Sequence, residues 1–140
     1  MVAIAASPSS DFAARLVLAA DDPTALAAFY GALLGQPAAE GHGPGHRILP
    51  LPGGGTLELY VPSRRRPRPA GRARLGLCLA RRGDGACLDA WIARATALGA
   101  VVEEGPRHEP FGWEVWLADP EGNGVLLLVE PEAAAAAGPP

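Results

Sequence analysis

The sequence has 140 residues, of which 12 are basic and 15 acidic, so its formal net charge is −3, and 49% of the residues are hydrophobic. This composition is typical of one globular domain or of two very small halves. Every basic residue is arginine, which excludes catalysis through a lysine Schiff base. The slight excess of acid argues against nucleic acid as a partner, because phosphate binding needs a basic face.

Neither a membrane nor an oxidising compartment is indicated. The chain has no run of about 18 apolar residues and no secretory-signal pattern at its N-terminus, so we expect a cytoplasmic protein with no membrane contact. Cys78 and Cys87 form no CxxC pair, and both are predicted to be small buried residues. The lysine-free, Ala-, Gly- and Pro-rich composition is typical of a GC-rich bacterial gene.

The first half predicts a strand, a helix and then a β-hairpin. Asp22 is suited to cap the helix, Pro23 to open it and Gly35 to end it in a left-handed conformation. The glycines of residues 52–55 predict the hairpin turn. The expected elements are a strand at 15–20, a helix at 23–34 and strands at 47–51 and 56–61.

The same order of elements then occurs again. Gly99 ends a second helix, and residues 119–124 consist of the types that turns prefer. The repeat indicates two related units of about 60 residues. The expected elements are a strand at 75–80, a helix at 86–98, and strands starting at 101 and spanning 113–118 and 125–130.

The two units are expected to be separated by a linker rich in arginine and proline. Its run of Arg64, Arg65, Arg66 and Arg68 is interpreted as solvated, with an anion-binding patch as the alternative. The predicted boundaries are 1–61 for the first module, 62–73 for the linker, 74–131 for the second module and 132–140 for a disordered tail.

Two segments resemble a known family. Residues 22–35, from Asp-Pro-Thr to Leu-Leu-Gly, and residues 118–123, Ala-Asp-Pro-Glu-Gly-Asn, are similar to the glyoxalase/bleomycin-resistance group of the vicinal oxygen chelate superfamily. The resemblance implies an α+β fold of two βαβββ modules, whose curved mixed sheets surround a cavity. It also implies a homodimer as a common assembly.

Enzymes of this superfamily hold a divalent metal through side chains on the first and last strand of each module. Projected by the resemblance, those four positions are Arg15, Glu58, Gly76 and Leu126. Only Glu58 can donate to a metal. His42 and His46 lie in a predicted glycine- and proline-rich loop and His108 in another loop, so they do not restore the site. We therefore expect neither a metal nor another cofactor.

Strand alternation predicts which side chains line the cavity instead. Arg15 and Glu58 either pair with each other or bind polar groups of a ligand. Phe111 and Trp113 are placed at the rim by similarity to drug-binding relatives, whereas Phe29 and Trp91 are expected in the core and Tyr30 partly exposed. The candidate ligand-binding residues are Arg15, Ile48, Glu58, Tyr60, Phe111, Trp113, Glu114, Trp116, Leu126 and Leu128.

A cavity of this kind suits an aromatic or hydrophobic small molecule. The favoured function is non-catalytic binding of such a ligand, for example sequestration of an antibiotic. The first alternative is a metal-dependent lyase, isomerase or dioxygenase of the same superfamily. The second is metal-free catalysis with Glu58 or Glu114 as general base. A partner-binding module without a cavity is a further alternative.

Overall fold

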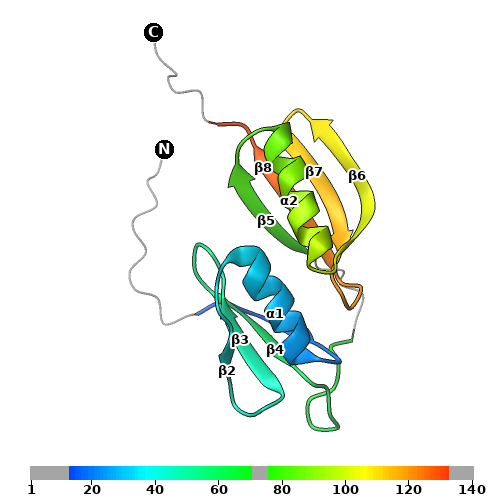
Figure 1. Ribbon diagram of the computed structural model, residues 1–140. Coiled ribbons are helices and arrows are strands. Elements are labelled where there is room, and N and C mark those ends of the chain that lie inside the picture. Colours follow the sequence, from blue (N-terminus) through cyan, green and yellow to red (C-terminus); the bar gives the residue numbers. More distant parts are fainter. Residues whose placement is uncertain (1–12, 71–75, 133–140) are drawn as a thin grey trace.

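The computed structural model describes residues 13–70 and 76–132 and confirms the α+β fold of two βαβββ modules (Figure 1). The first module contains β1 (Arg15–Ala19), α1 (Pro23–Leu34), β2 (Ala39–Glu40), β3 (His46–Pro50) and β4 (Thr56–Tyr60). The second contains β5 (Leu77–Arg82), α2 (Gly85–Ala97), β6 (Val101–Glu109), β7 (Gly112–Ala118) and β8 (Gly124–Glu130).

Each module forms its own mixed sheet of four strands. The strand orders are β1-β4-β3-β2 and β5-β8-β7-β6. In both sheets the first strand of the module runs parallel to the last, and the remaining neighbours are antiparallel. Over the described ranges, no strand of one sheet pairs with a strand of the other, so β1 and β5 each have a free edge.

Local capping explains why the helices begin and end where they do. The Asp22 carboxylate accepts a hydrogen bond from the Ala25 amide at 3.1 Å, and the Asp84 carboxylate accepts one from the Cys87 amide at 3.0 Å. Helix α1 ends at Gly35, whose φ of 68° is a left-handed conformation that costs glycine little. The bounds of α1 agree with those predicted from these capping residues.

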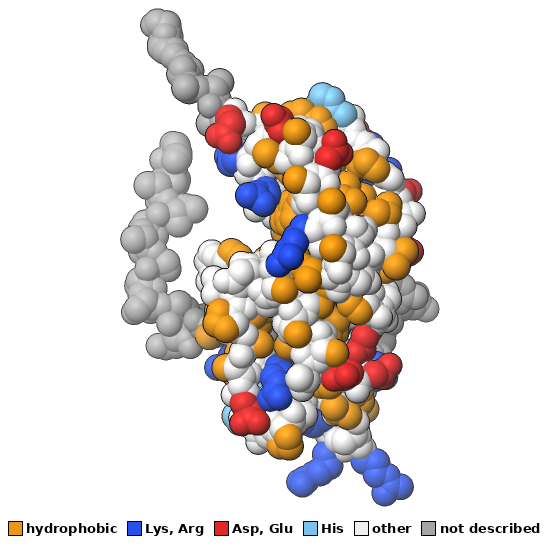
Figure 2. Space-filling model, viewed as in Figure 1, with side chains coloured by type: hydrophobic (Ala, Val, Ile, Leu, Met, Phe, Trp, Pro, Cys, Tyr) orange, Lys and Arg blue, Asp and Glu red, His pale blue; other side chains and the backbone are white. Residues whose placement is uncertain are grey.

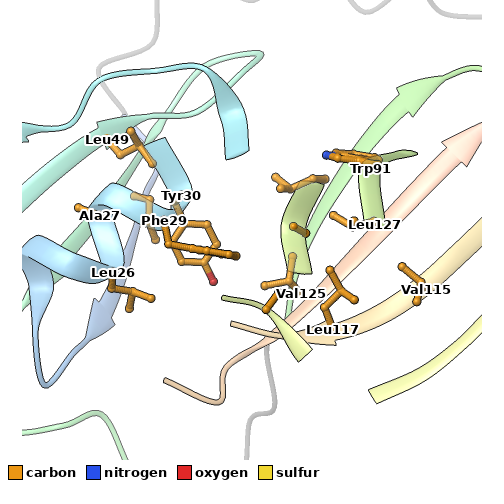
Figure 3. Packing of buried hydrophobic residues seen from close by; sticks show 14 of the residues in the cluster. Leu26, Ala27, Phe29, Tyr30, Leu49, Trp91, Val115, Leu117, Val125 and Leu127 are labelled. Atoms are coloured by element: carbon orange, nitrogen blue, oxygen red, sulfur yellow. The ribbon is translucent and has the colours of Figure 1, made fainter. Parts of the chain in front are cut away.

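Each helix covers one face of its own sheet, and the buried side chains of both modules form one cluster (Figures 1 and 3). Phe29 and Trp91 each lie seven residues after the N-cap aspartate of their helix, and both are buried. In Figure 3, Phe29 and Tyr30 point from α1 toward Val125 and Leu127 of β8. The prediction that Tyr30 is partly exposed is wrong: the side chain is 1% exposed.

The turn between β7 and β8 holds the two modules together. Asp119 accepts hydrogen bonds from the amides of Glu121 and Asn123, and its other oxygen accepts one from the Tyr30 hydroxyl at 2.6 Å. Burial, and then this bond to Asp119, raise the pKa of Tyr30. The Glu121 carboxylate accepts from the amides of Asp21 and Asp22 at 2.7 and 2.9 Å, at the start of α1.

The structure also departs from several expectations. Strand β3 begins at His46 rather than at 47, β5 lies two residues later than predicted, and the two-residue β2 was not predicted. Cys78 is exposed rather than buried, because the inner side of β5 has no covering helix. His108 lies in β6 rather than in a loop.

Two further expectations concern the ends of the modules. Residues 71–73 of the expected linker and 133–140 of the expected tail lie outside the described residues.

Both α-helices of the described part are too short to span a membrane.

Candidate functional site

The inner face of each sheet is the one turned away from its helix. Leu57 and Leu59 of β4 belong to the core beneath α1, so strand alternation places Glu58 and Tyr60 on the inner face. The same argument applied to β7 and β8 places Trp116 on the inner face of the second sheet. The other predicted site residues on the inner faces are Arg15, Ile48, Glu114, Leu126 and Leu128.

Glu58 lies in a buried cluster with a histidine for which a loop position was expected. His46 is 6% exposed, and its Nε2 lies 3.1 Å from Oε1 of Glu58. On the other side, Nη1 of Arg15 lies 3.5 Å from Oε2 of Glu58. Arg15 and Glu58 therefore form the ion pair that was one of the two predicted arrangements.

The hydrogen bonds around His46 assign its tautomer. The His42 amide donates to Nδ1 of His46 at 2.9 Å, so Nδ1 carries no proton. The proton of the neutral ring is then on Nε2, which donates to Glu58. The ring of His42 stacks on that of His46 with centroids 5.1 Å apart. Both nitrogens of His46 are engaged, so the ring has no free lone pair for a metal or for a substrate proton.

A strap formed by residues 61–68 covers Tyr60 on the inner face of the first sheet. The Tyr60 hydroxyl donates to the carbonyl oxygen of Pro67 at 2.7 Å, and the Arg66 guanidinium lies 4.9 Å from the centre of the Tyr60 ring. Arg68 forms an ion pair with Asp21. All four arginines of this run are exposed, as expected for a solvated segment, and Arg66 and Arg68 also make these surface contacts. Tyr60 beneath the strap is only 5% exposed.

On the inner face of the second sheet, the charge of Glu114 is paired and the ring of Trp116 lies against two glycines. Nε of Arg107 donates to Glu114 at 2.9 Å, and this bond is the largest cause of the raised pKa of Arg107. A Cβ added at Gly76 would lie 2.8 Å from the outer ring atoms of Trp116, and one added at Gly124 would lie 3.5 Å away. The indole thus lies over Gly76, just before β5, and over Gly124, the first residue of β8.

Trp113 and Phe111 do not lie with Trp116. Trp113 is on the helix-covered face of β7, where it packs against the core, and its ring stacks on His108 with centroids 4.6 Å apart. Phe111 lies in the turn between β6 and β7 and is 53% exposed. Trp113 and Trp116 lie on opposite faces of β7, because they are three positions apart and side chains alternate along a strand.

A pocket of about 400 Å³ lies where the free edge of β1 meets the start of β5 and the β7–β8 turn. We call it the seam pocket. Arg15 and Gly76, two of the four positions projected for a metal, both line it. Within the described ranges its lining consists of Arg15, Leu16, Val17, Leu18, Tyr30, Leu57, Gly76, Leu77, Asn123 and Gly124.

Two other hollows lie away from these positions. A groove of about 430 Å³ runs along the small residues of α1 and is bounded by Gln36 and Arg47. A cleft of about 330 Å³ separates Leu51 and Pro52 of the first module from Trp91 of the second, and Figure 2 shows a hollow between the modules on its left side. Neither hollow is lined by any of the four projected metal positions, so the seam pocket is the candidate ligand site.

The residues present do not fit a divalent metal. Over residues 13–70 and 76–132, no three His, Cys, Asp or Glu side chains are placed to hold an ion together. Glu58 is next to the Arg15 cation, and the nitrogens of His46 are used as described. Leu126 offers no donor atom. Within these residues, the side chains at the four projected positions therefore do not provide a complete set of metal ligands.

Three features of the inner faces were missed by sequence reasoning. A strand start one residue earlier would have placed His46 on the same face as Ile48, so alternation could have found it. The bond between Arg107 and Glu114 joins directly paired residues of β6 and β7 beside a register irregularity, and that irregularity has no sequence signal. The strap over Tyr60 also has none.

Comparison with known proteins is consistent with this geometry. A solved structure of a glyoxalase/bleomycin resistance protein/dioxygenase family enzyme from Burkholderia phytofirmans PsJN is 18% identical, with a TM-score of 0.64, over 83% of this chain and 96% of that one. Protein ATC0852 from Agrobacterium tumefaciens is 27% identical, with a TM-score of 0.64, over 83% and 94% of the two chains.

A lactoylglutathione lyase from Agrobacterium tumefaciens is 27% identical, with a TM-score of 0.57, over 88% of this chain and 96% of that one. No curated protein matches the chain. The sequence model of the family described as "Glyoxalase-like domain" matches residues 15–128, which is most of the chain. With its two βαβββ modules, the chain therefore belongs to the glyoxalase-like domain family, within the vicinal oxygen chelate superfamily.

Proposed function

We propose that the protein binds an aromatic or otherwise hydrophobic small molecule in the seam pocket and catalyses no reaction on it. Sequestration of an antibiotic in the bacterial cytoplasm, by a homodimer, is one form of this function. The observation that carries the proposal is the position of Trp116. Its indole lies against Gly76 and Gly124, beside Leu126, where relatives would supply metal ligands.

The surroundings of the pocket support binding rather than catalysis. Leu16, Leu18, Leu57 and Leu77 provide apolar walls of the kind that bury organic ligands. The carboxylates that could act as general bases already have protein partners, since Glu58 bonds to His46 and Glu114 bonds to Arg107. These partners engage both oxygens of Glu58 and one oxygen of Glu114.

The test uses a neutral apolar fluorophore, N-phenyl-1-naphthylamine, titrated into the purified protein. We expect its emission to rise and tryptophan emission to fall, because Trp116 adjoins Gly76 and Gly124 of the pocket wall. In Trp116→Phe most of the tryptophan quenching should disappear, whereas in Trp113→Phe it should remain, because Trp113 lies on the other face. Equal quenching in the two variants would contradict the proposed site.

A metal-dependent lyase remains the second candidate, favoured by the 27% identity to the lactoylglutathione lyase. Elemental analysis of the purified protein separates the two functions. One tightly held transition ion per chain, whose removal abolishes turnover of any substrate found, would establish the lyase and contradict binding without catalysis. For metal-free catalysis, Glu58→Gln should abolish turnover and spare binding.

A further inference from the structure

Polarity is distributed unevenly around the seam pocket. Among the ten described residues that line it, Arg15 is the only charged one, and most of the others are aliphatic or glycine. Of the polar groups, the Tyr30 hydroxyl already donates to Asp119. The pocket therefore offers an apolar body with one cationic end.

The Arg15 guanidinium has donors to spare. Its one charged neighbour in the described chain is Glu58, at 3.5 Å, and the side chain is 61% exposed. Glu58 in turn already accepts a hydrogen bond from His46. Arg107, in contrast, lies within 3.5 Å of three carboxylates, those of Glu104, Glu109 and Glu114. A guanidinium carries five N–H donors in a planar fork that matches a carboxylate or sulfonate.

A second polar group next to Arg15 has no partner among the residues that the structure describes. Oγ1 of Thr56 is buried and makes no hydrogen bond to any described residue. Thr56 is directly opposite Arg15 in the parallel pairing of β1 and β4, so both side chains are on the inner face. A buried hydroxyl without a partner is unfavourable, but Thr56 is not among the described residues that line the seam pocket.

We infer that the ligand of the seam pocket is a compact organic anion, whose carboxylate, sulfonate or phenolate group binds Arg15 while its aromatic or aliphatic body fills the apolar walls. This inference rests on the proposed function and adds the ligand's charge. A volume of about 400 Å³ admits a compact molecule of a few rings rather than a large natural product.

The test compares two fluorophores that share one ring system. Anilinonaphthalene sulfonate carries the anionic group, and N-phenyl-1-naphthylamine lacks it. Arg15→Gln should weaken binding of the sulfonate by about tenfold or more and change binding of the neutral probe less than about twofold, since only the charged group uses the guanidinium. The control is Arg94→Gln. Arg94 is exposed on α2 and does not line the pocket, so this variant should bind both fluorophores as the wild type does.

In Arg15→Gln, the sulfonate could also bind more weakly because the unpaired Glu58 carboxylate repels it. A double variant tests this explanation. If Arg15 acts as a donor, Arg15→Gln combined with Glu58→Gln should remain as weak for the sulfonate as Arg15→Gln alone. Recovery of affinity in the double variant, or an unchanged affinity in Arg15→Gln, would overturn the inference. If neither probe binds the wild-type protein, the proposed function itself fails. If both bind but are equally insensitive to Arg15, only the charge assignment fails.

Discussion

Tyr30 and Asp119 show how single residues connect the two modules. Tyr30 comes from α1 and Asp119 from the β7–β8 turn, and their bond of 2.6 Å is buried. The same Asp119 also accepts bonds from backbone amides of its own turn. One carboxylate therefore stabilises both the turn and the contact between the modules.

We expect Tyr30→Phe to lower the free energy of unfolding by about 1–2 kcal/mol, since it removes a hydrogen bond to a charged acceptor. Tyr60→Phe, which loses a bond to a neutral carbonyl, should cost less, about 0.5–1 kcal/mol. Urea denaturation at neutral pH measures both. A smaller loss in Tyr30→Phe than in Tyr60→Phe would contradict this assignment.

Tyr30→Phe should also change how stability depends on pH. Burial and Asp119 raise the pKa of Tyr30 above its usual 10.0, so above pH 10 the unfolded chain loses a proton that the folded chain keeps. The contribution of Tyr30 is therefore complete below pH 10 and is lost as the pH rises. Wild-type protein should lose more stability than Tyr30→Phe between neutral pH and pH 11.

Gly76 and Gly124 provide a matched pair of tests for the position of Trp116. A Cβ at Gly76 would lie 2.8 Å from the indole and force it to move, whereas a Cβ at Gly124 would make an ordinary contact at 3.5 Å. In a background of Trp91→Phe and Trp113→Phe, Gly76→Ala should shift the emission maximum of Trp116. Gly124→Ala should leave it nearly unchanged, and an equal shift in both would place the indole elsewhere.

At the scale of elements, the two segments that resemble the family touch each other. The turn at 119–123 meets the start of α1, where Glu121 accepts from the amides of Asp21 and Asp22. Free amides at a helix start favour a negative charge, so a carboxylate from the other module stabilises this helix. The motif thus has a structural role in this chain that its sequence alone does not reveal.

Glu121→Ala should destabilise the protein by about 1–2 kcal/mol, because two backbone donors lose a charged acceptor. Glu103→Ala is the control, because Glu103 is exposed on β6 and its substitution removes the same charge. Thermal and urea unfolding provide the comparison. If the two variants lose equal stability, the effect belongs to net charge and not to the contact between the modules.

Elements whose signals are local were the ones that could be predicted. The start and end of α1 follow from Asp22, Pro23 and Gly35, which act on neighbouring residues. A one-residue error at the start of β3 concealed His46, because a residue left outside the strand is not assigned to a face, although alternation would have placed it with Ile48. The strap over Tyr60 was not predictable, since it depends on where a proline-rich segment returns in space.

At the scale of the molecule, the buried residues of both modules belong to one cluster. The tyrosines, Tyr30 and Tyr60, are both in the first module, whereas all three tryptophans are in the second. Tyrosine absorbance and tryptophan fluorescence therefore report on different modules. The shared cluster and the bonds of Asp119 and Glu121 predict that the modules unfold together.

Urea titrations followed by the two signals should have coincident midpoints. The expectation is physical: exposing one module leaves apolar surface of the other in water, which adds to the cost of partial unfolding. Midpoints that separate reproducibly would show that each module unfolds independently and that the contacts between them are weak.

The position of the seam pocket has a consequence for stoichiometry. Two similar modules could in principle each provide a binding site. The seam pocket, however, is formed by both, with Arg15 from the first module and Gly76 and Asn123 from the second. Saturation should therefore occur at one molecule per polypeptide. A ligand that contacts both modules also opposes their separation. At a concentration one hundred times its dissociation constant, it would add about 2.7 kcal/mol to the free energy of unfolding.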